Sequence, residues 1–282
     1  MVHPASSKIV VAGLRRTALW IVAGALTAVC GMAQAGCSRV ITTPMAALGL
    51  SVIVDGDAVN GIYPEILRSN QSKETCVFAL TAVPRARQEL LFETGKSDIL
   101  LPASKTPRRD ELGVFVPLTS SRAVLISINT ERAPIKTLKD LLEAQDLKLA
   151  AVRGYDYGPA YQDLIAELTR QGRLRLESDP ISVARLMKNG VVNATVMAPT
   201  ILAGTLVDDE RVRGLADKLR YESIEELPWL SNGLYLSKTA LNEADRQALL
   251  EFFDRIAKSG AVWKGFQQFY EPSVLKVGLK PR

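Results

Sequence analysis

Short apolar segments alternate with helix-like stretches along most of this chain, and the alternation constrains the fold more than any other feature. The apolar segments are 39–43, 77–80, 98–101, 148–152, 173–176 and 194–197. The helix-like stretches are 63–70, 84–93, 138–144, 159–170 and 181–188. Strands and helices that alternate in this way build a mostly parallel sheet with helices on both faces. We therefore predict an α/β protein.

Two extended stretches, 121–129 and 221–236, interrupt the alternation. They predict two crossings between lobes, by which the chain leaves one lobe and later returns to it. We expect the first lobe to be discontinuous, 36–120 with 226–282, and the second lobe to be 121–225. In the first lobe, Asp55-Gly56 predicts a small hairpin, and 243–258, closed by Gly260, predicts an amphipathic helix.

The first 35 residues have the layout of a secretory signal peptide. They contain no Asp or Glu, carry Arg15 and Arg16, and run apolar over 18–29 before Ala33-Gln34-Ala35. The apolar run is too short to span a bilayer, which needs about 20 residues. We predict cleavage after Ala35 and a periplasmic protein.

The composition excludes several classes of function. Without the signal peptide the formal charge falls from +5 to +2, and no basic stripe remains for nucleic acid. The one histidine, His3, lies within the signal peptide, so histidine-based catalytic triads and histidine-ligated metals are excluded. We expect no metal and no cofactor.

Two cysteines remain after the signal peptide, Cys37 and Cys76. They precede the first and second predicted strands, and the starts of two strands in a right-handed βαβ unit lie side by side. Neighbouring strands are about 4.8 Å apart, which suits a disulfide. We predict a Cys37–Cys76 bridge; two free buried thiols are the alternative.

Several short motifs occur in an order that resembles one known family. They are 61–66 (GIYPEI), 83–87 (VPRAR), 95–99 (GKSDI), 106–109 (TPRR), 152–154 (VRG) and 190–195 (GVVNAT). Together they resemble the periplasmic solute-binding proteins of polar amino acid ABC transporters, family 3, over nearly the whole chain after the signal peptide. The resemblance implies a type II periplasmic-binding-protein fold: two α/β lobes, joined by two hinge strands, that close on a small solute.

In this fold, ligands bind beyond the carboxyl ends of the strands. Ser104 and Thr106 follow the segment 98–101, so we predict that both contact the ligand. The resemblance implies that the arginine of the Thr-x-x-Arg segment, Arg109, grips a ligand carboxylate as an exposed residue of the cleft. The alternative for Arg109 is a structural ion pair with an adjacent acidic residue, Asp110 or Glu111.

The second lobe contributes the loop 154–159 (GYDYGP), in which Gly154 follows a predicted strand and Pro159 suits a first helical position. Free amide groups at a helix start can receive an anion. We predict that Gly154, Tyr155, Asp156 and Tyr157 contact the ligand. The tyrosines alternatively line the lobe surface, and Asp156 alternatively forms the turn.

Two departures from the family concern the ligand's charge. Arg85 stands where the family usually has an aromatic residue, and 196–199 (VMAP) replaces a strand end that usually carries an acid for the α-ammonium group. A buried ammonium group without a partner is costly. We therefore predict a small organic acid or dicarboxylate. In the alternative, Arg85 points to solvent and Asp156 takes the ammonium group.

The sequence thus predicts a secreted, monomeric binding protein, and no enzyme, that captures a small carboxylate-containing solute for an ABC permease in the membrane. One alternative is a sensory or accessory binding subunit for a membrane kinase or a dehydrogenase. Another is a periplasmic dehydratase or lyase that acts on a small acid, with Asp156 as the candidate proton donor.

Overall fold

The computed structural model describes residues 1–3, 36–207 and 209–282. The chain forms two units, Met1–Ala33 and Gln34–Arg282, and the fold below is that of the second. Beyond residue 3, the predicted signal peptide lies outside the described residues, as does Ala35 at its predicted cleavage site. Among the helices of the described part, none has both the length and the apolar character needed to cross a membrane.

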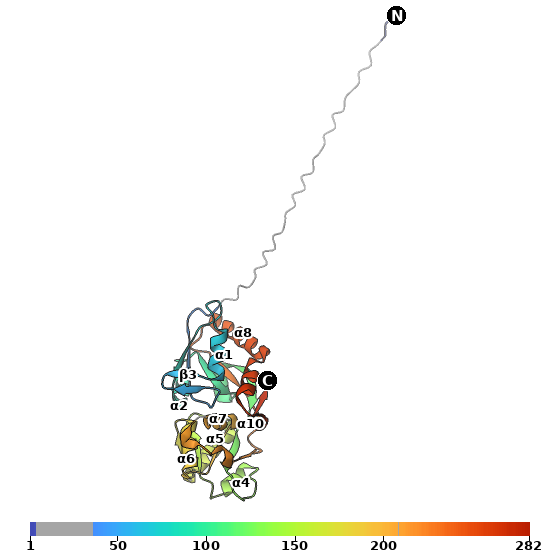
Figure 1. Cartoon of the computed structure of the whole chain (residues 1–282). Helices are drawn as coiled ribbons and strands as arrows, with labels where there is room; N and C mark the ends of the chain where they lie inside the picture. The colour runs from blue at the N-terminus through green and yellow to red at the C-terminus, as the bar shows by residue number, and fades with distance from the viewer. Residues whose placement is uncertain (4–35, 208) are drawn as a thin grey trace. The chain divides into compact units, whose positions relative to one another are not determined.

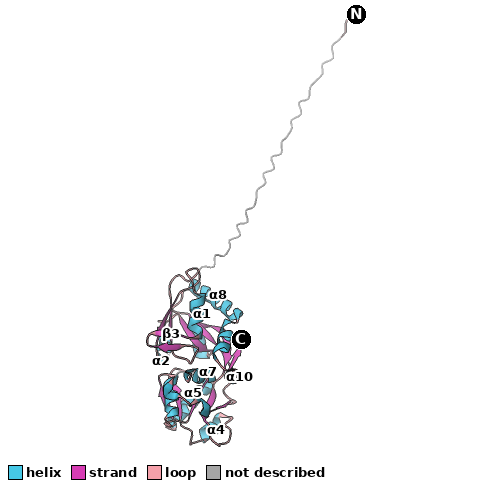
Figure 2. Cartoon of the chain, viewed as in Figure 1, coloured by secondary structure: helices cyan, strands magenta, loops and turns pink. Residues whose placement is uncertain are grey.

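The second unit is an α/β protein with two lobes, whose helices and strands can be followed in Figures 1 and 2. The strands of the first lobe are β1 (Ile41–Met45), β2 (Ile53–Asp55), β3 (Ala58–Asn60), β4 (Phe78–Ala82), β5 (Ile99–Ser104), β6 (Gly113–Ser121), β12 (Leu230–Ser237) and β13 (Leu279–Pro281). Its helices are α1 (Ile62–Asn70), α2 (Arg85–Glu93), α3 (Pro107–Leu112), α8 (Glu243–Ser259), α9 (Ala261–Phe269) and α10 (Pro272–Gly278). The predicted hairpin at Asp55-Gly56 is confirmed as β2 and β3.

The second lobe is built around a five-stranded sheet of order β11-β7-β10-β8-β9. The strands are β7 (Val124–Ile128), β8 (Leu149–Val152), β9 (Leu174–Glu177), β10 (Ala194–Met197) and β11 (Leu219–Glu222). The helices are α4 (Leu138–Glu143), α5 (Pro159–Arg170), α6 (Pro180–Lys188) and α7 (Pro199–Thr205), with short 3-10 turns at Glu210–Val212 and Ala216–Lys218. The lobe boundaries at 120/121 and 225/226 stay a prediction.

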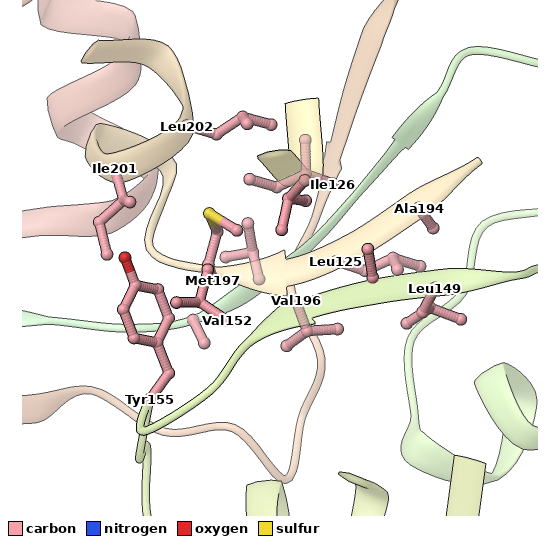
Figure 3. Packing of buried hydrophobic residues seen from close by; sticks show 14 of the residues in the cluster. Leu125, Ile126, Leu149, Val152, Tyr155, Ala194, Val196, Met197, Ile201 and Leu202 are labelled. Atoms are coloured by element: carbon pink, nitrogen blue, oxygen red, sulfur yellow. The ribbon is translucent and has the colours of Figure 1, made fainter. Parts of the chain in front are cut away.

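Each lobe has its own hydrophobic core. Central strands of the second lobe are buried on both faces and are therefore mostly apolar, as in Leu125 and Ile126 of β7 and Val196 of β10, with Ser127 and Thr195 as their buried polar residues. Figure 3 shows these side chains packed together, with Tyr155 beside Ile201 at the edge of the cluster. Of the aromatic residues in 262–270, Trp263, Phe266 and Tyr270 pack in the core of the first lobe, whereas Phe269 is exposed.

The sheets are mixed, so the prediction of mostly parallel sheets is wrong in this respect. The pairs β1–β4, β8–β9 and β8–β10 are parallel, whereas β12 runs antiparallel to both β5 and β6, and β7 runs antiparallel to β10 and β11. The chain leaves the first lobe along β6 and returns along β12. Because one of these neighbouring strands leads out of the lobe and the other leads back into it, the two run in opposite directions.

The predicted disulfide is confirmed: Cys37 and Cys76 are bonded, with their Cα atoms 4.8 Å apart. The bridge lies just before the parallel pair β1–β4, in which Ile41 faces Phe78. The same segment is tied to α8, because the backbone N–H of Ser38 donates to Asp245 Oδ1 at 2.6 Å. The first crossover is therefore closed covalently at its base.

Candidate functional site

Six of the predicted site residues surround one cavity of about 40 Å³. They come from the first lobe (Arg85, Ser104, Arg109) and from the second (Tyr155, Asp156, Tyr157). The other lining residues are Leu48, Ser51, Tyr63, Pro102, Ala103, Ser121, Ala198, Thr200, Ile201, Asn232, Phe266 and Leu279. Thr106 and Gly154 do not line this cavity and instead support residues that do.

Thr106 positions the helix that carries Arg109. It is the N-cap of α3, and its side chain accepts from the backbone N–H of Arg109 at 3.4 Å. Its own N–H donates to the hydroxyl of Tyr235 at 3.0 Å, and that hydroxyl donates to Asp110 Oδ1 at 2.9 Å. Tyr235 comes from β12, so the start of α3 is fixed to an inner strand of the sheet.

Arg109 is buried and paired, so the expectation of an exposed cleft residue is wrong. Its Nη2 donates to Glu89 Oε1 at 2.7 Å and its Nη1 donates to the carbonyl of Ser104 at 2.9 Å. The alternative ion pair with an adjacent acid is also wrong, because the partner is Glu89 of α2. By contrast, the side chain of the adjacent Arg108 is 69% exposed and pairs with Glu93.

Arg85 is 6% exposed, so the alternative in which it points to solvent is wrong. Its Nη1 donates to Gln88 Oε1 at 2.8 Å and to the carbonyl of Pro102 at 2.9 Å, and its Nη2 donates to Glu89. Burial lowers the pKa of the Arg85 guanidinium, Glu89 opposes that shift, and nearby Arg109 adds to it. The group stays charged because an arginine pKa starts far above neutral.

The loop 154–159 brings the second lobe against α2. Gly154 has φ of +83°, and a Cβ on it would lie 3.1 Å from the backbone of Ala86, so glycine allows this close approach. Tyr157 is buried, and its hydroxyl accepts from the N–H of Ala198 at 3.2 Å. Burial raises the pKa of Tyr157 to about 12.

Tyr155 and Asp156 differ in how their polar atoms are satisfied. The hydroxyl of Tyr155 is buried and has no hydrogen-bond partner in the described part of the chain, and burial raises its pKa well above the usual value. In Figure 3 this hydroxyl is directed toward Ile201. Asp156 is half-buried, and its Oδ1 accepts from the N–H of Gly158 at 2.8 Å, at the start of α5.

Glu89 is the charged residue of this site that sequence reasoning missed. The sequence feature that could have indicated Glu89 is its position four residues after Arg85 on one helix, because opposite charges at this spacing lie on the same face and can pair. Its second partner, Arg109, is 20 residues away, and no sequence pattern predicted that contact. The described residues contain no group of three or more His, Cys, Asp or Glu side chains that could hold a metal ion.

The fold is the two-lobed α/β fold of periplasmic binding proteins. The amino acid transporter substrate-binding protein AbpA from Streptococcus pneumoniae, solved with L-arginine, is similar over 84% of this chain and 94% of its own, with 17% identity and a TM-score of 0.63. A histidine kinase sensor domain is similar over 87% of this chain and 99% of its own, with 15% identity and a TM-score of 0.63.

A third similar structure is that of the ancestral amino acid-binding protein AncCDT-1, described as a precursor of cyclohexadienyl dehydratase. The similarity covers 82% of this chain and 95% of that protein. The identity is 14% and the TM-score 0.60. Neither a family model nor a curated protein sequence matches the chain. At these identities the likeness concerns the fold.

Proposed function

We propose that this protein is a secreted solute-binding protein that captures a small carboxylate-containing solute between its two lobes. One observation carries the proposal: two guanidinium groups, Arg85 and Arg109, line one small cavity. Arginine presents its N–H donors as a planar fork that matches a carboxylate. Buried guanidinium groups at a cavity therefore favour an anionic ligand.

The remaining lining residues support a small ligand. The cavity of about 40 Å³ has room for a few non-hydrogen atoms beyond a single water molecule. Hydroxyl and amide side chains from both lobes, on Ser51, Ser121, Thr200 and Asn232, offer further hydrogen bonds. A solute held in this way orders both lobes around it, as in hinged binding proteins.

We propose that the protein is located in the periplasm and that its partner is an ABC permease in the membrane. The support is the signal-peptide pattern of residues 1–35, the disulfide, which forms in oxidising compartments, and the fold it shares with transporter binding proteins.

The test is calorimetry of the purified protein against a panel of small carboxylates, followed by Arg109→Ala. We expect the variant to lose at least about 100-fold in affinity, because it removes charge-assisted hydrogen bonds to the ligand. Arg109→Lys keeps the charge without the fork and should lose less. Circular dichroism establishes that both variants are folded.

Arg108→Ala is the matched control. It removes the neighbouring guanidinium of the same helix, which is exposed and paired with Glu93 outside the cavity. We expect affinity within about two-fold of the wild-type value, since an exposed pair contributes little. Equal affinity of wild type and Arg109→Ala for every carboxylate that binds would overturn the proposal.

A second candidate function is a sensory or accessory subunit, supported by the likeness to a histidine kinase sensor domain. Uptake of a radiolabelled ligand by cells with and without the gene separates transport from sensing. The dehydratase alternative rests on Asp156, whose carboxylate already binds the start of α5, a structural role that needs no transferable proton. Proton NMR of candidate acids incubated with the protein detects any product.

A further inference from the structure

We propose that Glu89 sets the charge of the ligand, so that the site takes a small monocarboxylate without an ammonium group in preference to a dicarboxylate or a zwitterionic amino acid. This inference rests on the proposed function and deepens it. It follows from how the two guanidinium groups share one carboxylate.

Glu89 holds both arginines. Its Oε1 accepts from Arg85 Nη2 and, at 2.7 Å, from Arg109 Nη2, while its Oε2 accepts from Arg109 Nε at 3.3 Å. The Glu89 side chain is only 13% exposed, and the two arginine side chains are 7% and 4% exposed. Charges so weakly hydrated interact strongly and tolerate little imbalance.

Donors remain for a ligand on both arginines. Each Nη atom carries two N–H groups, so the Nη atoms of Arg109, each with one bond assigned, keep further donor capacity. In Arg85, Nε is buried and has no partner among the described residues. A buried donor in this state is costly until an acceptor arrives, and a ligand carboxylate supplies one.

The charges of Arg85, Glu89 and Arg109 do not cancel. Two guanidinium groups and one carboxylate leave a single positive charge in excess. Glu89 is not among the residues that line the cavity, and it instead lines the groove outside, together with Glu93 and Arg108. It therefore neutralises one arginine from behind and leaves the cavity side of both available to the ligand.

Asp156 is the other carboxylate to consider, because it lines both the cavity and the outer groove. It is half-buried, and its Oδ1 is bound to the N–H of Gly158 at the start of α5, where the positive end of the helix dipole compensates a negative charge. We therefore count the excess positive charge of Arg85, Glu89 and Arg109 as the charge that the ligand meets.

One negative charge on the ligand completes this balance. A second carboxylate would be buried without a counter-charge. An ammonium group would meet two guanidinium groups, and the end of β10, Met197-Ala198-Pro199, offers it no acid. The unpartnered hydroxyl of Tyr155 instead favours an uncharged oxygen on the ligand, as in a 2-hydroxy or 2-oxo acid.

The experiment measures dissociation constants by calorimetry for three acids of equal chain length: 2-hydroxybutanoate, succinate and 2-aminobutanoate. Wild type should bind 2-hydroxybutanoate most tightly. Glu89→Gln should shift the preference toward succinate by about 10-fold, the order expected for one unit charge close to a partly buried site. Arg85→Gln should shift the preference toward 2-aminobutanoate by a similar factor.

The double variant Arg85→Gln/Glu89→Gln restores the original charge and should restore the original preference, even where a single variant is unstable. Glu93→Gln, a charge change of equal size on the same helix but paired with Arg108, is the matched control and should leave the preference unchanged. Preferences in Glu89→Gln that equal those of the control would overturn the inference and leave the proposed function standing. Failure of wild type to bind any of the three acids would overturn the inference, and failure to bind any acid of the wider carboxylate panel would overturn the proposed function as well.

Discussion

The disulfide between Cys37 and Cys76 allows a quantitative prediction for the double variant Cys37→Ser/Cys76→Ser. The two cysteines are 39 residues apart in the sequence. In the chain-entropy model, closing a loop of this length removes about 13 cal/mol/K from the unfolded chain, or about 4 kcal/mol at 25 °C. For a protein of this size, that loss should lower the melting temperature by about 8–16 °C.

The native structure should change little, because non-covalent contacts hold the same segment. The N–H of Cys37 donates to the carbonyl of Thr75 at 2.6 Å, and β1 pairs with β4 directly after the bridge. Since neither cysteine lines the cavity, ligand affinity should stay within about two-fold of wild type. The predicted loss of stability therefore arises from the greater conformational entropy of the unfolded chain without the bridge.

Urea unfolding, followed by circular dichroism, measures the difference. Wild type unfolded in the presence of a reductant is the matched control, because it loses the same bridge without a change of sequence. Both should fall below oxidised wild type by the same amount. A difference under about 1 kcal/mol would refute the reasoning, since it would mean that the unfolded chain is already restricted in this loop.

Three further predictions concern single substitutions. Gly233→Ala should destabilise the protein by about 2 kcal/mol in urea unfolding, because its Cβ would lie 2.0 Å from the carbonyl of Val116 at the register shift of β12; an unchanged midpoint would contradict this. Tyr235→Phe should cost about 1–2 kcal/mol and weaken ligand binding, because the start of α3 loses its hydroxyl anchor; calorimetry and urea unfolding check both effects. Hydrogen bonds from Arg170 and Gln171 lower the pKa of Glu167 from 4.5 to about 2. The ionised carboxylate therefore stabilises the folded protein fully above pH 4.5, and this stabilisation is lost as the pH falls toward 2. In acid titrations, the difference in stability between wild type and Glu167→Gln should shrink over that range; a constant difference would contradict the prediction.

Much of the fold was predictable from local patterns. The period of apolar residues predicted helix α5 at 159–170 as it occurs, and it predicted α8 to within a residue at its end. The bridge between Cys37 and Cys76 followed from the parallel arrangement of two adjacent strands. These features depend on short-range periodicity or on the geometry of one βαβ unit, and both can be read from a single stretch of chain.

Other elements were not predictable in this way. Helix α3, at Pro107–Leu112, is only 6 residues long, fewer than two helical turns, so its sequence is too short to show a repeating apolar face. The antiparallel course of β12 beside β6 depends on the return of the chain from the second lobe. No local pattern records which distant strand becomes a neighbour.

The candidate site shows the same division. The sequence, with the family resemblance, predicted that Arg85, Ser104, Arg109, Tyr155, Asp156 and Tyr157 contact one ligand beyond the carboxyl ends of the strands, and in the structure these six residues line one cavity. The burial of both arginines and the place of Glu89 between them depend instead on the tertiary structure. The physical reason is that burial and charge pairing depend on the packing of α2 against α3, and that packing joins segments 20 residues apart through side chains whose positions no local pattern records.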